Sequence, residues 1–375
     1  MIFSFLRRHA WWLIPLLIFD FFLFRWLLAD GTEGDTGRRG RRVSQQVEIP
    51  ARSRDEVFGL RYGYPTDQQE LWNTESAVVY QPTASGRVES ALYGSVRTRS
   101  SGGRLLPAFH MGIDIASLER DRRGRPLDKI YAVADGRVGY VNRVGGNSSY
   151  GIYIVLLHDD PLGEIYTLYS HMARVEPGIK EGVSVSRGDV LGVMGNTAST
   201  GIPMVRAHLH FEIGVVYNAR FRRWYRAQEL VPDHGVYHGW NLTGIDPLAV
   251  FGEKGQEEIR FNLRTYLWEL EPAFALIVRT TKPLDYFERY PDLWDGQAFF
   301  AEASAIVMTV SESGMPLSGR MASPEEVAAL DGDRAQVLEV DEEVLGRNGM
   351  RYVVQRGDSW EVGRNAERWL DILTQ

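Results

Sequence analysis

The chain has 375 residues, a formal net charge of -7 and no cysteine. The acidic balance gives no electrostatic reason to expect a nucleic-acid partner, and the lack of cysteine excludes disulfides and thiolate metal ligands. Any transition-metal site must therefore be built from imidazole and carboxylate groups. The length allows two globular domains of ~100–200 residues beyond a targeting segment.

Residues 1–30 are expected to form a membrane anchor. Arg7 and Arg8 precede about twenty mostly apolar residues, a length that crosses a bilayer core of ~30 Å. A cleaved signal peptide and an ordinary buried helix are the alternatives. Arginines between residues 38 and 42 follow the span, and the positive-inside rule taken alone argues against export of the rest of the chain.

Two further segments precede the main domain. Residues 31–46, GTEGDTGRRGRRVSQQ, are rich in glycine and charge, which is the composition of a linker. Residues 47–103 contain short apolar stretches, SAVVYQP and SALYGSV, between turn residues. We expect an N-terminal arm there, whose fold the pattern does not define.

Residues 104–251 are predicted to form one mainly β domain. Short β-rich runs follow one another at close spacing, among them KIYAVADGRVGYVNRV, YGIYIVLLHDD, EIYTLYSHM, VSVSRGDVLGVMG and AHLHFEIGVVY. This pattern favours an antiparallel sheet or sandwich over alternating strands and helices. The ADG and RGD sequences are expected to be hairpin turns.

Residues 257–375 are predicted to form a smaller α+β domain after the polar stretch GEKGQEE. Its β-rich runs are FALIVRT, AIVMTV, AQVLEV and RYVVQ. A helix is expected in SPEEVAAL, where Ser323 and Glu326 have the spacing of a capping box.

Histidines and acids gather in three motifs of the β domain. In AHLHFEI, residues 207–213, the alternation predicts a strand with His208, His210 and Glu212 on one face. In FHMGIDIA, residues 109–116, His110 and Asp114 are four apart, and Gly112 with the neighbouring isoleucines favours a strand. His171 follows in LYSHM, which is also predicted to be a strand.

Together these motifs have the composition of a catalytic zinc site. Two imidazoles and one carboxylate from separate strands supply three tetrahedral ligands and leave the fourth position to water. Two histidines then remain for proton transfer or oxyanion stabilisation, which a structural zinc site would not need. The other histidines of the domain, His158, His234 and His238, are expected to be surface or core residues.

In order and spacing, these motifs resemble the lysostaphin and LytM-type zinc metallopeptidases, which cut peptide cross-links of bacterial peptidoglycan. FHMGIDIA is similar to the first motif of that family, TLYSHM to the middle one and AHLHFEI to the last, and DPLAVF is similar to its closing segment. The resemblance implies that His110, Asp114 and His210 bind one Zn²⁺ per chain. It also implies that His171 and His208 are catalytic histidines that do not bind the metal.

Glu212, on the same strand face, is expected to orient a ligand histidine or to have a structural role. The resemblance further implies that the substrate is a peptidoglycan stem peptide and that the domain lies in the cell envelope, outside the cytoplasm and periplasmic in a Gram-negative cell. One alternative is a catalytically idle envelope protein that binds and activates another wall hydrolase. Another is a zinc peptidase that acts on ordinary proteins. The C-terminal domain is a possible contact for an envelope protein partner.

Two segments depart from the family pattern. SLERDRRGRPLDK, residues 117–129, replaces a short turn, and residues 217–244 form a long insertion after the last motif. Both adjoin motif strands, so they either line a substrate groove or form solvated loops. Residues 47–100 are a hypothetical inhibitory arm over that groove.

Overall fold

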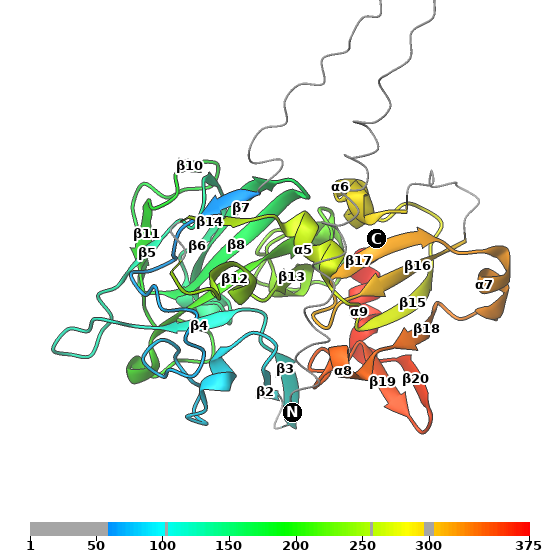
Figure 1. Ribbon diagram of the computed structural model, residues 1–375, viewed down its shortest axis with the longest axis horizontal. Helices are drawn as coiled ribbons and strands as arrows, with labels where there is room; N and C mark the ends of the chain where they lie inside the picture. Colours follow the sequence, from blue (N-terminus) through cyan, green and yellow to red (C-terminus); the bar gives the residue numbers. More distant parts are fainter. Residues whose placement is uncertain (1–58, 102–103, 256–257, 296–303) are drawn as a thin grey trace, which may run out of the picture. The chain divides into compact units, whose positions relative to one another are not determined.

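The computed structural model describes residues 59–101, 104–255, 258–295 and 304–375, all within one compact unit that spans residues 52–375 (Figure 1). The predicted membrane anchor, residues 1–30, and the predicted linker, residues 31–46, lie outside these residues. Among the helices of the described residues, none has both the length and the apolar content needed to cross a membrane.

The largest sheet carries the predicted site. Its strands follow the order β10, β6, β7, β8, β12 and β13, and β4 also pairs with β12 (Figure 1). All of these pairings are antiparallel, as the sequence predicts. The strands are β4 (Ile113–Ala116), β6 (Gly136–Asn142), β7 (Ile152–Asp160), β8 (Gly163–Met172), β10 (Ser184–Val185), β12 (His208–Val216) and β13 (Leu242–Ile245).

A second sheet joins β5 (Lys129–Tyr131), β11 (Val190–Val193) and β9 (Arg174–Val175). The ADG turn leads from β5 into β6, and the RGD turn leads from β10 into β11, so both carry the chain from one sheet to the other. The prediction that they close hairpins is therefore wrong. Turn residues favour a change of direction but do not choose the pairing partner, and the burial of Ile130 and Leu191 favours the β5–β11 pair.

Strand β12 lies between two hydrophobic clusters. Leu209, Phe211 and Ile213 are fully buried in the main cluster on one face. On the other face β7 and β8 form a second cluster that includes Tyr153 and Tyr166. Because both faces of β12 are covered, His208, His210 and Glu212 are buried as well.

The described part of the predicted N-terminal arm packs along the β domain. Strand β1 (Leu60–Tyr62) pairs with β14 (Ile259–Phe261), and β2 (Val96–Ser101) forms a hairpin with β3 (Arg104–Phe109). Between them, the backbone of Val79 accepts a hydrogen bond from Ala116 at 2.9 Å. The Gln81 N–H donates to the Asp114 carbonyl, also at 2.9 Å, so the arm runs beside β4.

The C-terminal region has the predicted mixture of strands and helices. Its main sheet has the order β17 (Pro316–Met321), β16 (Ala305–Val310), β15 (Phe274–Arg279) and β18 (Ala335–Val340), and β19 (Val353–Arg356) forms a hairpin with β20 (Ser359–Val362). Helix α7 (Pro324–Ala329) begins with the predicted capping box of Ser323 and Glu326. The other helices are α3 (Phe221–Ala227), α4 (Leu248–Phe251), α5 (Leu263–Glu269), α6 (Asp285–Arg289), α8 (Glu342–Leu345) and α9 (Arg364–Leu373).

The β domain and the C-terminal region share the main hydrophobic cluster. Buried hydrogen bonds also join them: Tyr217 Oη donates to the Gly314 carbonyl at 3.0 Å, and Asn218 Nδ2 donates to the Ile372 carbonyl at 2.6 Å. The predicted boundary between residues 251 and 257 stays a prediction.

Candidate metal centre

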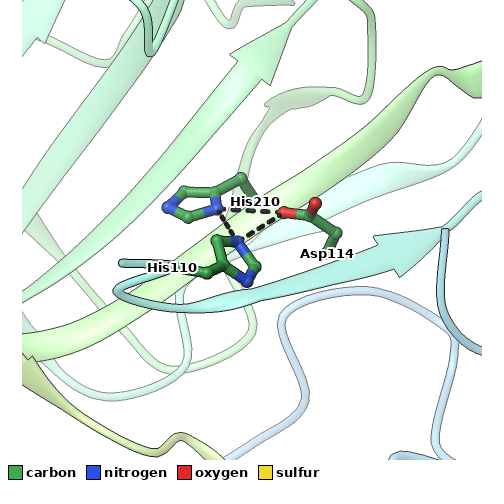
Figure 2. Close-up of side chains that lie close together, drawn as sticks. All are labelled: His110, Asp114 and His210. Carbon is green, nitrogen blue, oxygen red and sulfur yellow. Dashed lines mark hydrogen bonds and ion pairs between the residues drawn. The ribbon is translucent and has the colours of Figure 1, made fainter. Parts of the chain in front are cut away.

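Three side chains from two neighbouring segments converge in the largest sheet. Strands β4 and β12 are paired so that His210 lies directly opposite Asp114, and His110 lies in the turn between β3 and β4. Figure 2 shows the three side chains pointing toward one another. His110 Nε2 lies 3.1 Å from Asp114 Oδ1 and 3.0 Å from His210 Nδ1, and the last two atoms are 3.0 Å apart.

The triangle of donor atoms fits a tetrahedral metal ion. Two ligand atoms at ~2.0 Å from a tetrahedral Zn²⁺ lie ~3.3 Å apart, which is close to the separations of 3.0–3.1 Å found here. All three residues are buried, with exposed fractions of 4% for His110, 2% for Asp114 and 7% for His210. These residues form a group that could hold a metal ion, as the sequence predicts.

The backbone between His110 and Asp114 differs from the prediction that they share one strand. Only Asp114 lies in a strand, because the chain turns at Met111 and Gly112 before β4 begins. Gly112 sits against β12 so closely that a Cβ atom would lie 2.1 Å from the Phe211 carbonyl oxygen. This close approach lets the turn bring His110 over the face of β12.

The second nitrogen of each candidate ligand histidine has its own partner. His110 Nδ1 lies 2.9 Å from the Leu92 carbonyl, which fixes Nε2 as the nitrogen without a proton. His210 Nε2 lies 2.8 Å from Glu212 Oε1, which leaves Nδ1 for the metal. Each ring thus turns one nitrogen toward the other two candidate ligands and the second nitrogen toward a partner outside the group.

Glu212 is itself fixed from two sides. Its carboxylate accepts hydrogen bonds from Tyr150 Oη at 2.8 Å and from Tyr166 Oη at 2.9 Å, and its exposed fraction is 1%. A buried carboxylate with three donors is well compensated for its loss of hydration. Glu212 thus occupies the place expected of a residue that orients a ligand histidine.

The two remaining predicted site residues lie beside this group. The ring centroids of His171 and His208 are 4.8 Å apart, and that of His171 is 5.9 Å from that of His210. His208 Nδ1 lies 2.7 Å from the Arg206 carbonyl, and His171 Nδ1 lies 2.9 Å from the Thr197 carbonyl. In both rings Nδ1 is bound to a backbone carbonyl, so Nε2 is the nitrogen available to a substrate or water. The structure thus brings all five predicted site residues together.

His171 has an unusual backbone conformation. Its φ of 59° lies in the left-handed region, which residues other than glycine seldom adopt. The register between β7 and β8 shifts at this point, with Ile152 opposite Met172 but Ile154 opposite Tyr169. The irregularity turns His171 out of the regular alternation of β8, and such distortions are common next to active sites.

Arg97 is a contact that the sequence analysis missed. Its Nη2 atom lies 2.6 Å from Asp114 Oδ2, the carboxylate oxygen that does not face the two histidines. It also lies 3.1 Å from His110 Nδ1. Arg97 belongs to the predicted arm, and nothing in its local sequence indicates a place beside Asp114.

The charges of these groups depend on burial and on their neighbours. Burial raises the pKa of Asp114, but Arg97 and His110 outweigh it and hold that pKa well below its usual range. Burial lowers the pKa of His110 to about 4 and that of His171 well below its usual value. For His210 burial also lowers the pKa, but hydrogen bonds to Asp114 and Glu212 outweigh it and raise the value to about 9.

The other histidines of the domain have the structural places that the sequence predicts. His158 is buried, with its ring nitrogens 2.8 Å from the Asp135 carbonyl and from Thr167 Oγ1. His234 Nδ1 lies 3.0 Å from Tyr140 Oη, and the His238 side chain caps a short 3₁₀ helix at residues 239–241.

The site opens into a cavity of about 300 Å³. Its wall combines site residues with residues of the arm and of the loop before β12, namely Gln81, Pro82, Thr83, Arg97, Asp114, Ser149, Tyr150, His171, Ala198, Thr200, Ile202, Arg206, His208 and His210. None of the described residues of 117–129 or 217–244 lines this cavity. The arm forms part of the wall, and inhibition by the arm stays a prediction.

Residues 108–221 match the sequence model of peptidase family M23. This segment is similar to that family. The match contains all five predicted site residues and confirms the resemblance to the lysostaphin and LytM-type peptidases. It is shorter than the span of residues 104–251 that the motifs suggest. M23 peptidases are metallopeptidases, and the buried His110, Asp114 and His210 are a fitting metal-binding group.

Several solved structures are similar to part of the chain. A zinc-containing peptidase from Vibrio cholerae is 25% identical, with a TM-score of 0.22, over 36% of this chain and 35% of its own. The catalytic domain of lysostaphin from Staphylococcus simulans is 20% identical, with a TM-score of 0.26, over 42% of this chain and 86% of its own. The catalytic domain of the M23 protein EnpA from Enterococcus faecalis is 18% identical, with a TM-score of 0.24, over 48% of this chain and 100% of its own. The chain thus spans about a third of the Vibrio peptidase, and no curated protein matches it.

Proposed function

We propose that the protein is a zinc-dependent endopeptidase that hydrolyses peptide cross-links of bacterial peptidoglycan. The observation that carries this proposal is the completeness of the site: three donor atoms converge in one buried group, and Asp114, His210 and the two further histidines line the cavity beside it. A protein that only binds a partner has no need for all five groups.

His110 Nε2, Asp114 Oδ1 and His210 Nδ1 would hold Zn²⁺. When bound there, the ion supplies a Lewis acid that polarises a peptide carbonyl and makes water more acidic. Arg97 keeps Asp114 Oδ2 occupied, so that Asp114 offers the ion one oxygen. Glu212 keeps the proton of His210 on Nε2.

His171 and His208 carry out the proton transfers in this proposal. The depressed pKa of His171 keeps its ring neutral at pH 7, so that Nε2 accepts a hydrogen bond or a proton. One histidine takes the proton from the attacking water, and the other, in its protonated form, donates a hydrogen bond to the oxyanion. The proton taken from the water passes to the leaving amine as the C–N bond breaks. The cavity gives both rings access to the same peptide.

The place of action is proposed on the same grounds. A peptidoglycan substrate requires the catalytic domain to lie outside the cytoplasm, and residues 1–30 would anchor it to the membrane. The C-terminal region is available to an envelope protein partner. A fusion of residues 1–46 to a reporter that is active only after export tests this topology.

The test of the reaction uses purified protein and cross-linked peptidoglycan, with and without a chelator, and mass spectrometry of the fragments. We expect loss of cross-linked dimers that a chelator stops and added Zn²⁺ restores. Parallel incubation with casein tests for a peptidase of ordinary proteins. Failure to cut either substrate, together with stimulation of a second wall hydrolase, would support the idle alternative instead.

A further inference from the structure

A second cavity, of about 540 Å³, adjoins the one at the metal centre. Thr83, Arg97 and Arg206 line both cavities, so the two cavities are neighbours at these three residues. The remaining wall comes from the arm and from the C-terminal region. Its polar groups are mostly hydroxyls and guanidinium groups.

The second cavity is strongly basic although the chain as a whole has a net charge of -7. Arg87, Arg97, Arg206 and Arg347 line it, and Glu89 is the only acidic residue in its described wall. Glu89 lies 3.7 Å from Arg87 and compensates that residue. An anion entering the cavity therefore meets a local field opposite to that of the rest of the protein.

Two of these arginines have no acidic partner within the described part of the chain. Arg97 is bound to Asp114, but no hydrogen bond or ion pair between described residues involves the side chains of Arg206 and Arg347. Arg206 is half-buried and Arg347 is exposed. The Arg206 carbonyl binds His208, and Arg347 follows α8, whose Leu345 is buried.

We infer that Arg206 and Arg347 bind a free carboxylate of the substrate next to the bond that is cut. A guanidinium group matches the planar geometry of a carboxylate and binds it with two parallel hydrogen bonds. Arg206 lines both cavities and lies two residues before β12, the strand that carries His208 and His210. A carboxylate bound to Arg206 therefore lies close to the beginning of that strand. The preferred substrates are therefore anionic peptides, and the C-terminal region contributes to their recognition through Arg347.

This inference rests on the proposed function and specifies its substrate class. The test uses two synthetic cross-linked peptides that differ only in a carboxylate or a carboxamide beside the scissile bond. For the wild-type protein with Zn²⁺ we expect kcat/KM to be about 10-fold higher for the acid, mainly through KM, because a charge-assisted hydrogen bond is lost in the amide. R206Q and R347Q should each lower the rate on the acid more than the rate on the amide, and so reduce this preference, while their zinc content equals that of the wild-type protein.

R206K is a conservative variant that should keep part of the preference, and R187Q is the matched control. Arg187 is an exposed arginine in the turn between β10 and β11 and does not line the basic cavity. Equal kcat/KM for the acid and the amide in the wild-type protein would overturn the inference. So would an equal loss on both peptides in R206Q.

Binding of both peptides to the zinc-free protein, measured by calorimetry, separates this inference from the proposed reaction. Tighter binding of the acid that is lost in R206Q would support the inference even if no peptide is cut. Absence of chelator-sensitive cleavage would count against the proposed function alone. Equal binding of acid and amide, with cleavage intact, would count against the carboxylate site alone.

Discussion

Glu212 Oε1 lies 2.8 Å from His210 Nε2, on the side of the ring away from Asp114. We expect Glu212→Ala to weaken zinc binding by about 10- to 100-fold, because the ring loses the group that fixes its tautomer and orientation. Competition with a chromophoric chelator measures this change. Tyr166→Phe is the control, because it removes one donor to Glu212 and leaves the contact with His210 in place. Zinc affinity equal to wild type in Glu212→Ala would contradict the proposed orienting role.

His208 and His210 are expected to have different roles although they lie on one strand face. His210→Ala should lose both bound zinc and activity, because it removes one of three ligand atoms. His208→Ala should keep zinc and lose about 10²- to 10⁴-fold in rate, the usual effect of removing a general acid or base. Metal analysis and the dimer-cleavage assay together separate the two outcomes. Equal release of zinc from both variants would refute this division.

The backbone conformation of His171 predicts that a glycine variant is more stable than an alanine variant, which is the reverse of the usual order. Because φ is 59°, glycine adopts this conformation more readily than alanine. His171→Gly should be more stable than His171→Ala by about 1 kcal/mol, measured by urea unfolding. Both variants should be inactive, since each lacks the imidazole. A more stable alanine variant would show that the left-handed conformation is absent.

Gly112 should tolerate no side chain. A Cβ atom there would lie 2.1 Å from the Phe211 carbonyl, so Gly112→Ala must push β4 away from β12. We expect a loss of about 3 kcal/mol in unfolding free energy, together with weaker zinc binding. Gly178→Ala is the matched control, because no atom lies within 4 Å of the added Cβ and the backbone needs no positive φ. Similar unfolding free energies for both variants would argue against the close packing of β4 on β12.

Glu312 should make stability depend on pH. Burial raises the pKa of its carboxyl to about 7, and the charge of Asp246 adds to this shift. The folded state therefore keeps a proton that the unfolded chain releases near pH 4.5, so that stability falls as pH rises from about 4.5 to 7. Glu312→Gln should be more stable than wild type at pH 8, by on the order of 1 kcal/mol after solvent screening of this partly exposed group, and similar at pH 4. Thermal unfolding at both pH values checks this, and an equal difference at both would contradict it.

Much of the strand content follows from alternation that is visible in the sequence. AHLHFEIGVVY has apolar residues at every second position, and it forms β12 with Leu209 and Phe211 in the main cluster. The capping box at Ser323 is likewise a local feature and was predictable from four residues. Pairing across sheets is not local, which is why the expectation that the ADG and RGD turns close hairpins is wrong.

The site was predictable as a set of residues but not as a set of contacts. The resemblance of three motifs to the lysostaphin and LytM-type peptidases implies His110, Asp114 and His210 as the metal ligands, because histidine and aspartate side chains in those motifs carry the chemistry themselves. The place of Arg97 depends on a hairpin that folds back over residues 110–114, and an arginine in a polar run gives no sign of that. The conformation of His171 arises from a register shift that needs both β7 and β8.

The position of His210 opposite Asp114 on β4 and Ser170 on β8 links metal content to correct folding. A slip of β12 by one residue would turn Leu209 and Phe211 toward Asp114 and remove every imidazole of that strand from the site. Such a chain could keep most of its backbone hydrogen bonds and still bind no zinc. The stoichiometry of zinc in a purified sample is therefore a measure of the fraction of molecules with native strand register.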